Sequence, residues 1–161
     1  MADGCDFFAE LVREHVAIEA RLKELDQAAL AVSVDAGDRA ALGTVAATLA
    51  FFAMEGAHHQ AHEELTLLPR LRHLPELKQL VIAMDFQHKM NDATGQELAA
   101  CIDDFSPERS RELRRLAVRF AEMHRGHMVA EERAIFPIAK SALSPAVLAE
   151  MGNEMQARRR G

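Results

Sequence analysis

The sequence has no tryptophan, no tyrosine and only two cysteines among its 161 residues. Cys5 and Cys101 are too few to build a disulfide framework, and we expect both thiols to be reduced. The chain also lacks a glycine-rich phosphate loop, a CxxC pair and a nucleophile elbow, so the function classes that depend on these motifs are not indicated. The chemistry must therefore come from other residue types.

Long apolar runs and a net positive charge are missing as well. No window reaches the roughly 18 uninterrupted apolar residues of a membrane span, and the start MADGCDFFAE lacks the basic and apolar regions of a secretory signal. We therefore expect a cytoplasmic protein with no membrane partner. Because the net charge is -6 and the pI is near 5.7, no nucleic-acid partner is expected. The basic end, Arg158 to Arg160, is predicted to be a solvated tail.

Helical periodicity runs through nearly all of the sequence. From Phe7 to Leu25 apolar residues recur at spacings of three and four and include His15, and a similar stripe after Pro75 includes His88. Alternating β-branched runs are absent. Four segments of roughly 27 to 30 residues, each about 40 to 45 Å long, predict an all-α, up-down-up-down four-helix bundle with a short C-terminal helix.

The expected boundaries follow from composition and from helix signals. With 49% hydrophobic and 27% charged residues, the chain should form a single domain over residues 1–161, with the bundle at about 5–140 and the C-terminal helix at about 144–157. Asp38 should cap the second helix, which Pro69 should end or kink.

The fourth helix has its own start signal in the stretch SPERS. Ser106 should act as its cap, with Pro107 in the first helical position. From there the periodic pattern predicts a helix that reaches about Phe136.

One motif occurs twice. FAMEGAHHQAHEELTLLP, from Phe52 to Pro69, aligns with FAEMHRGHMVAEERAIFP, from Phe120 to Pro137, and both read F-A-x5-H-x3-E-E-x4-P. His15 lies 44 residues before the first motif's histidine, and His88 lies 39 residues before the second's. Each half of the chain is therefore a helix with one inward histidine followed by a helix with His-x3-Glu.

This spacing has a chemical reason. Residues four apart share a helix face, so His59 with Glu63, and His127 with Glu131, each present an imidazole and a carboxylate to the bundle interior. Buried carboxylates without partners cost several kcal/mol and take up protons, whereas cations would hold them ionised. A single such pair is more often a surface contact, but two copies in register favour a dinuclear metal site.

The doubled motif resembles that of hemerythrin-like (HHE cation-binding) domains, as in HQAHEELTLLP and HMVAEERAIFP, over roughly residues 5 to 140. The resemblance implies a non-haem centre of two iron ions, bridged by two carboxylates and an oxo or hydroxo group. It implies terminal histidine ligands and bridging glutamates, carried here by His15, His59, His88, His127, Glu63 and Glu131. Other divalent ions such as zinc or manganese are not excluded, since they accept the same ligands.

The chain departs from the oxygen-carrying hemerythrins in its third helix. The carriers have two histidines four residues apart there, whereas the neighbours of His88 at that spacing are Met84 and Asp92. Two octahedral irons offer twelve positions, of which the bridges take six and four histidines take four. Two positions would remain for water, oxygen or another side chain.

His124 is the candidate for that side chain. It lies one turn before His127 and aligns with Gly56 of the first repeat, so the halves differ where a ligand pocket would form. Two interpretations stay open: a fifth ligand or pocket acid/base, and a histidine that lies outside the ligand set. Four acidic residues should flank the ligands: Glu64 and Glu132 through surface or interhelical contacts, and Glu19 and Asp92 as groups that orient His15 and His88 or as ordinary surface acids.

Two function classes follow from these features. The first is a stand-alone, cytoplasmic di-iron protein that binds or senses O2 or a related small ligand. The alternative is a di-iron oxidoreductase that acts on peroxide, nitrogen oxides or ferrous iron. No catalytic residue is assigned, so enzymatic activity stays open, and the sequence does not identify a redox or signalling partner.

Overall fold

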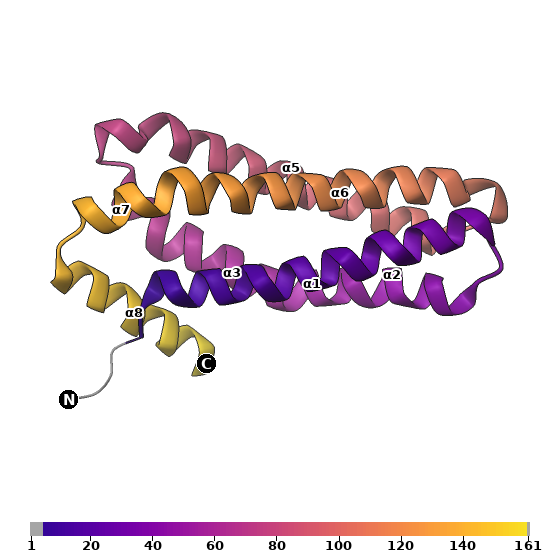
Figure 1. Ribbon diagram of the computed structural model, residues 1–161, viewed down its shortest axis with the longest axis horizontal. Coiled ribbons are helices and arrows are strands. Elements are labelled where there is room, and N and C mark those ends of the chain that lie inside the picture. Colours follow the sequence, from indigo (N-terminus) through magenta and orange to yellow (C-terminus); the bar gives the residue numbers. More distant parts are fainter. Residues whose placement is uncertain (1–4, 161) are drawn as a thin grey trace.

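The computed structural model describes residues 5–160, and residues 1–4 and 161 of the expected 1–161 domain lie outside this part. Four helical rods run alternately up and down, and a further helix lies across one end of the bundle (Figure 1). No strand occurs within residues 5–160, which confirms the predicted all-α bundle with a C-terminal helix. The α-helices are α1 (Phe7–Val34), α2 (Arg39–Phe51), α3 (Ala57–His62), α4 (Leu68–Leu71), α5 (Lys78–Asp103), α6 (Ser110–Ala130), α7 (Phe136–Ala142) and α8 (Pro145–Arg160).

Wider helical turns join the shorter helices into continuous rods. The π-helical turns are η1 (Phe52–Gly56), η2 (Glu63–Leu67) and η5 (Glu131–Ile135), and short 3-10 turns, η3 (Pro75–Leu77) and η4 (Pro107–Arg109), precede α5 and α6. In η2 the N–H of Leu68 donates to the carbonyl of Glu63, five residues earlier. Phe136 does the same with Glu131 in η5, so the two repeats share this irregularity.

The π turns correct two expected helix ends. Pro69 was expected to end or kink the second helix, but it lies in the first turn of α4, and the rod continues to Leu71. Pro137 likewise opens α7, so the fourth rod reaches Ala142 and not only Phe136. A proline lacks an N–H and clashes with the carbonyl four residues back, and the wider turn before it gives the helix a new first turn that tolerates it.

Most helix starts follow the sequence signals. Asp38 caps α2 as predicted, because its Oδ1 accepts from the N–H of Ala41 at 2.9 Å. Ser106 stands at the expected start but makes no capping hydrogen bond, because Pro107 opens a 3-10 turn there. The last helix starts at Pro145, close to the expected position, and runs three residues further than expected, to Arg160.

The core consists of two apolar blocks on either side of a polar layer. One block packs α1, α2, α5 and α6 around residues such as Leu22, Leu98 and Leu113. The other lies towards α8 and is built on residues such as Leu11 and Met84. Since each large side chain removed from water contributes roughly 1.5–3 kcal/mol, both blocks hold the backbone around the polar layer firmly.

The basic end of the chain is part of α8 and is not the predicted solvated tail. Arg159 donates to Glu10 at 2.9 Å and to Glu14 at 2.7 Å, and Arg158 donates to Nδ1 of His62 at 2.6 Å. The helix approaches α1 closely because Gly152 has no side chain. A Cβ at this position would lie 2.0 Å from the backbone oxygen of Cys5.

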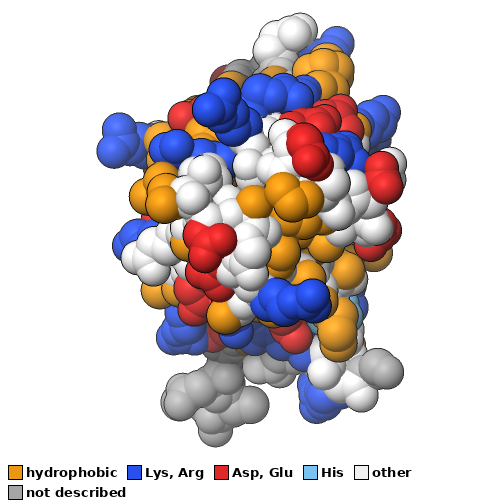
Figure 2. All heavy atoms as spheres, turned by 90° about the vertical axis from the view of Figure 1, so that its right-hand side faces the viewer, with side chains coloured by type: hydrophobic (Ala, Val, Ile, Leu, Met, Phe, Trp, Pro, Cys, Tyr) orange, Lys and Arg blue, Asp and Glu red, His pale blue; other side chains and the backbone are white. Residues whose placement is uncertain are grey.

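Figure 2 looks onto the end of the bundle where α1 turns into α2 and α5 into α6. Basic, acidic and apolar side chains are interspersed over this end. A hollow near this end of the bundle is bordered by Arg111, Arg114 and Arg115 of α6 together with Ser33 and Val118. That the protein binds no nucleic acid stays a prediction.

One rod could cross a membrane by length and composition alone. Within residues 5–160 this is Arg39–Leu71, whose most apolar window has a mean hydropathy of 1.5 and is 17% buried. A single helix of this kind is weak evidence, because helices of soluble bundles also pass such a test. This one carries the buried His59 and Glu63. The cytoplasmic location stays a prediction.

Candidate metal centre

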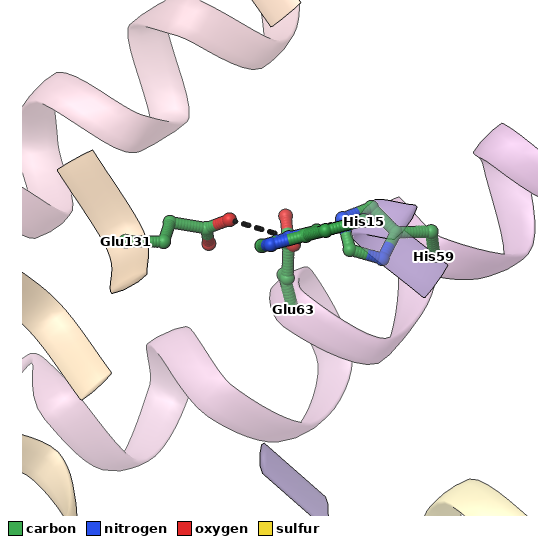
Figure 3. A group of neighbouring side chains, drawn as sticks. All are labelled: His15, His59, Glu63 and Glu131. Atoms are coloured by element: carbon green, nitrogen blue, oxygen red, sulfur yellow. Dashed lines mark ion pairs between the residues drawn. The ribbon is translucent and has the colours of Figure 1, made fainter. Parts of the chain in front are cut away.

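The six predicted ligands all lie in the polar layer between the apolar blocks. They come from all four rods and are at most 7% exposed: His15 of α1, His59 of α3, Glu63 of η2, His88 of α5, His127 of α6 and Glu131 of η5. Figure 3 shows four of them pointing toward one another, His15 and His59 with Glu63 and Glu131. The fold therefore brings together every residue that the doubled motif singled out.

The ligand-type atoms form two overlapping groups. One contains His15, His59, Glu63 and Glu131, the other Glu63, His88 and His127, and within each group these atoms all lie within 4.8 Å of one another.

Both glutamates reach histidines of both halves of the chain. Oε1 of Glu63 lies 2.7 Å from Nε2 of His59, and its Oε2 lies 2.9 Å from Nε2 of His88. Oε2 of Glu131 lies 3.2 Å from Nε2 of His15 and 3.5 Å from Nε2 of His127. Glu63 belongs to both ligand groups, whereas Glu131 belongs to the one with His15 and His59.

Outer acceptors fix all four imidazole rings. The Nδ1–H of His15 donates to Glu132 at 2.7 Å, and that of His88 donates to Glu64 at 2.9 Å. These contacts confirm that the second glutamate of each repeat makes an interhelical contact. Because each Nδ1 donates to an outer acceptor, Nε2 is the ring nitrogen that faces the centre of the layer.

The acceptors of the other two rings were not predicted. Glu14 accepts from Nδ1 of His59 at 2.9 Å, and Gln87 accepts from Nδ1 of His127 at 3.0 Å. Glu14 immediately precedes His15, and Gln87 immediately precedes His88. The internal repeat could have indicated both acceptors, because each directly precedes the inward histidine of its half of the chain.

Glu19 and Asp92, the expected orienting groups, have other surroundings. Glu19 pairs with Arg125 of α6 at 2.9 Å, and Asp92 is an exposed residue. The interpretation that they are ordinary surface acids holds. A spacing of four residues places them on the histidine's face, but the ring nitrogens of His15 and His88 turn toward the neighbouring rods.

Unpaired polar atoms concentrate in this layer. Among buried side-chain atoms of the described residues that lack a hydrogen-bond partner are Nε2 of His15 and His59, Oε1 of Glu63 and both oxygens of Glu131. Nε2 of His59 and Oε1 of Glu63 lie close together, but their orientation is not that of a hydrogen bond. Orphaned lone pairs on imidazoles and carboxylates are what one or two divalent cations would satisfy, so the donor set fits a metal centre.

The charges of the layer are strongly perturbed. Burial favours the neutral ring of His59, but the charge of Glu63 and the hydrogen bond to Glu14 together raise its pKa to about 10. Burial and the neighbouring charge of Glu63 raise the pKa of Glu131. The pKa of Glu63 lies well below its usual range, because the charge of His59 and the hydrogen bonds of His127 and His88 outweigh its burial. Metal-free protein therefore holds protons where cations would bind.

His124 lies beside the layer and outside both ligand groups. Its Nδ1–H donates to the carbonyl of Phe120 at 2.9 Å, and its ring packs against Phe52 and Phe120 with centroids 4.7 and 4.2 Å away. Burial lowers its pKa to about 4, so the ring is neutral and Nε2 is an acceptor. Its predicted role as ligand or pocket residue stays a prediction.

His62 is buried, and like His124 it has no histidine at the corresponding position of the other repeat. Its Nδ1 accepts from Arg158, and its Nε2 lies 3.5 Å from Oε1 of Glu14. Burial lowers its pKa to about 4. His62 therefore links Arg158 of α8 to Glu14, which accepts from His59. His58 and His73 are exposed, as expected.

Comparisons with known proteins point to one family. The model of the hemerythrin HHE cation-binding domain matches residues 6–139. An uncharacterized protein of Haemophilus influenzae is 27% identical over 123 residues, which cover 75% of this chain and 71% of that protein. The matched region contains all six candidate ligands, whereas the whole of α8 lies beyond it.

Proposed function

Because the chain belongs to the hemerythrin HHE cation-binding domain family, we propose that its polar layer holds two iron ions and binds or senses O2 or a related small ligand. The ligands in this proposal are His15, His59, His88 and His127, with Glu63 and Glu131 as bridges.

One observation carries the proposal. All four rings have Nδ1 occupied by an outer acceptor, and all four Nε2 atoms face the two buried carboxylates. Histidines that merely fill a core would need no such uniform orientation, whereas metal-binding histidines usually donate their second N–H to a carboxylate or carbonyl. Iron bound here would supply open coordination positions and redox chemistry, while the protein's part is to orient the four rings around the two carboxylates.

A second candidate function is a di-iron oxidoreductase. It is favoured by a cleft of about 600 Å³ beside the layer, lined by His59, His88 and His127 among others. This cleft gives molecules larger than O2 a route to the metal ligands. Peroxide, nitrogen oxides and ferrous iron are the substrates to test.

The first experiment is anaerobic loading with ferrous iron, followed by admission of O2 while the ultraviolet-visible spectrum is recorded. The protein has no tryptophan or tyrosine, so its own absorption will hardly obscure charge-transfer bands in the near ultraviolet. A visible band that appears with O2 and vanishes on its removal would support reversible binding. Irreversible conversion to ferric bands would favour the oxidoreductase.

Metal identity needs a separate control. Parallel loading with zinc and manganese, followed by elemental analysis, compares the metals that this ligand set accepts. Failure to bind any of them at two ions per chain would overturn the proposal.

A further inference from the structure

The cleft beside the polar layer reaches the candidate ligands and extends away from them along the bundle. Asn91 lies three residues after His88 on α5, and His124 lies three residues before His127 on α6. Because α5 and α6 run in opposite directions, both steps lead the same way along the bundle (Figure 1). Ile18, three residues after His15 on α1, also lines the cleft.

Small residues keep this side of the layer open. A Cβ on Gly56 would lie 2.9 Å from Cδ1 of Phe52, and a Cβ on Gly95 would lie 3.2 Å from Cε2 of Phe120. Alanines line the rest of the opening between the second rod and α5. On the opposite side of the layer, the apolar block around Leu11 and Met84 fills the interior.

The size of the cleft suits an organic molecule. Its volume of about 600 Å³ falls inside the range of roughly 300–1,000 Å³ that small-molecule sites occupy. Along α5 its lining runs from His88 to Ala99, which corresponds to about 16 Å of helix. A diatomic ligand would use only a small part of this length.

The cleft holds two polar groups that await a partner. Asn91 is 5% exposed, and its Oδ1 has no hydrogen-bond partner among the described residues. His124 uses Nδ1 within its own helix, which leaves Nε2 as an acceptor. The remaining inner wall is apolar, with Ile18, Phe52 and Phe120. A hydroxyl group would donate to one of these two acceptors, and an apolar body attached to it would pack against the apolar wall.

Charge decides against ionised ligands. Glu64 and Asp92 line the cleft, and no lysine or arginine is among the described residues that do so. These carboxylates would repel an anion such as a fatty acid. The proposed metal pair would repel a cation and attract an anion, so the exclusion of anions applies to the metal-free protein, and the exclusion of cations rests on the proposed function.

We propose that the cleft binds a neutral alcohol or phenol with an elongated apolar body. The hydroxyl group lies between Asn91 and His124, one turn from the metal ligands, and the apolar body extends along α5 toward Ala99. The site is distinct from the metal positions, because neither Asn91 nor His124 belongs to the ligand groups.

The test is equilibrium dialysis of the full chain with 2-naphthol, naphthalene and naphthalene-2-carboxylate, each measured by fluorescence in the protein-free chamber. We expect 2-naphthol to bind about tenfold more tightly than naphthalene, the worth of one good buried hydrogen bond, and the carboxylate to bind most weakly. Equal affinity for all three, or no binding, would overturn the proposal. Binding is measured with both metal-free and metal-loaded protein. The result with metal-free protein tests the cleft even if the proposed metal centre is wrong.

One pair of variants and a further single substitution locate the site. Ala99→Phe should block the cleft and abolish binding of 2-naphthol, whereas Ala100→Phe, at an exposed neighbour that does not line it, should bind normally. Asn91→Leu should lower affinity for 2-naphthol about tenfold and leave naphthalene unchanged. If Ala99→Phe does not fold by circular dichroism, Ala57→Phe at the exposed rim replaces it. Unchanged binding in the cleft variants refutes the assignment.

Discussion

Removal of one outer acceptor tests whether the rings are held for metal. Glu132 accepts from Nδ1 of His15 at 2.7 Å, and its side chain is 43% exposed. Glu132→Ala therefore removes a hydrogen bond to a proposed ligand while leaving the core intact. Loss of such an acceptor typically costs 10- to 100-fold in metal affinity, or about 1.4 to 2.7 kcal/mol. Glu132→Gln keeps an acceptor without the charge, so its loss should be smaller.

The assay is an anaerobic competition between the protein and a chelator for ferrous iron. Glu122→Ala is the matched control, because Glu122 is an exposed glutamate on α6 away from the ligands. Thermal unfolding of the metal-free variants should match that of the unaltered protein, since the contact orients a ring and buries little surface. If Glu132→Ala and Glu122→Ala hold iron equally well, the outer acceptors do not act on the metal, and the central observation behind the proposed function fails.

Three further changes probe other parts of the structure. Glu131→Ala should abolish loading of two irons per chain, because a proposed bridge is lost; retention of two irons in elemental analysis would contradict the assignment. Because the pKa of His59 is near 10, its ring stays protonated until a metal ion displaces the proton. Iron loading at pH 7 should therefore release protons into weakly buffered solution, and the affinity for iron should fall as the pH falls. Gly152→Ala should lower the melting temperature, because the new Cβ would meet the Cys5 oxygen. Gly43 lies inside a helix, and a Cβ added there would meet nothing within 4 Å, so Gly43→Ala should instead stabilise the protein by roughly 0.5–1 kcal/mol. Equal effects of Gly152→Ala and Gly43→Ala on stability would refute this account of how α8 packs.

The rods and the clustering of the six candidate ligands could be predicted because both depend on local spacing. Helical periodicity put His15 and His88 on apolar faces, and the four-residue step tied His59 to Glu63. The structure brings these residues together in one buried layer. A single motif is a weak signal, but two copies in register restrict how the four rods can be arranged around the candidate ligands.

Contacts between rods were harder to predict, because neither helix alone fixes its register against the other. Glu14 and Gln87 point across to a neighbouring rod, so no spacing within their own helices indicates their partners. The widened turns at Glu63 and Glu131 were missed for a related reason, since the proline that demands them comes six residues later. The docking of Arg159 depends on backbone contact at Gly152, and a short basic segment carries no sign of this.

The two halves of the chain repeat, but the two places for metal do not have equal surroundings. The ring of His15 stacks on Phe136, with centroids 5.9 Å apart and planes at 17°, and does not line the cleft. Both histidines of the other group, His88 and His127, line it, whereas His59 lines it and His15 does not in the first group. An ion between His88 and His127 would exchange with solution faster than its neighbour, so the centre should load in sequence and accept mixed-metal pairs. A preparation with one iron per chain would then be a half-exchanged centre, with another metal retained at the sheltered position.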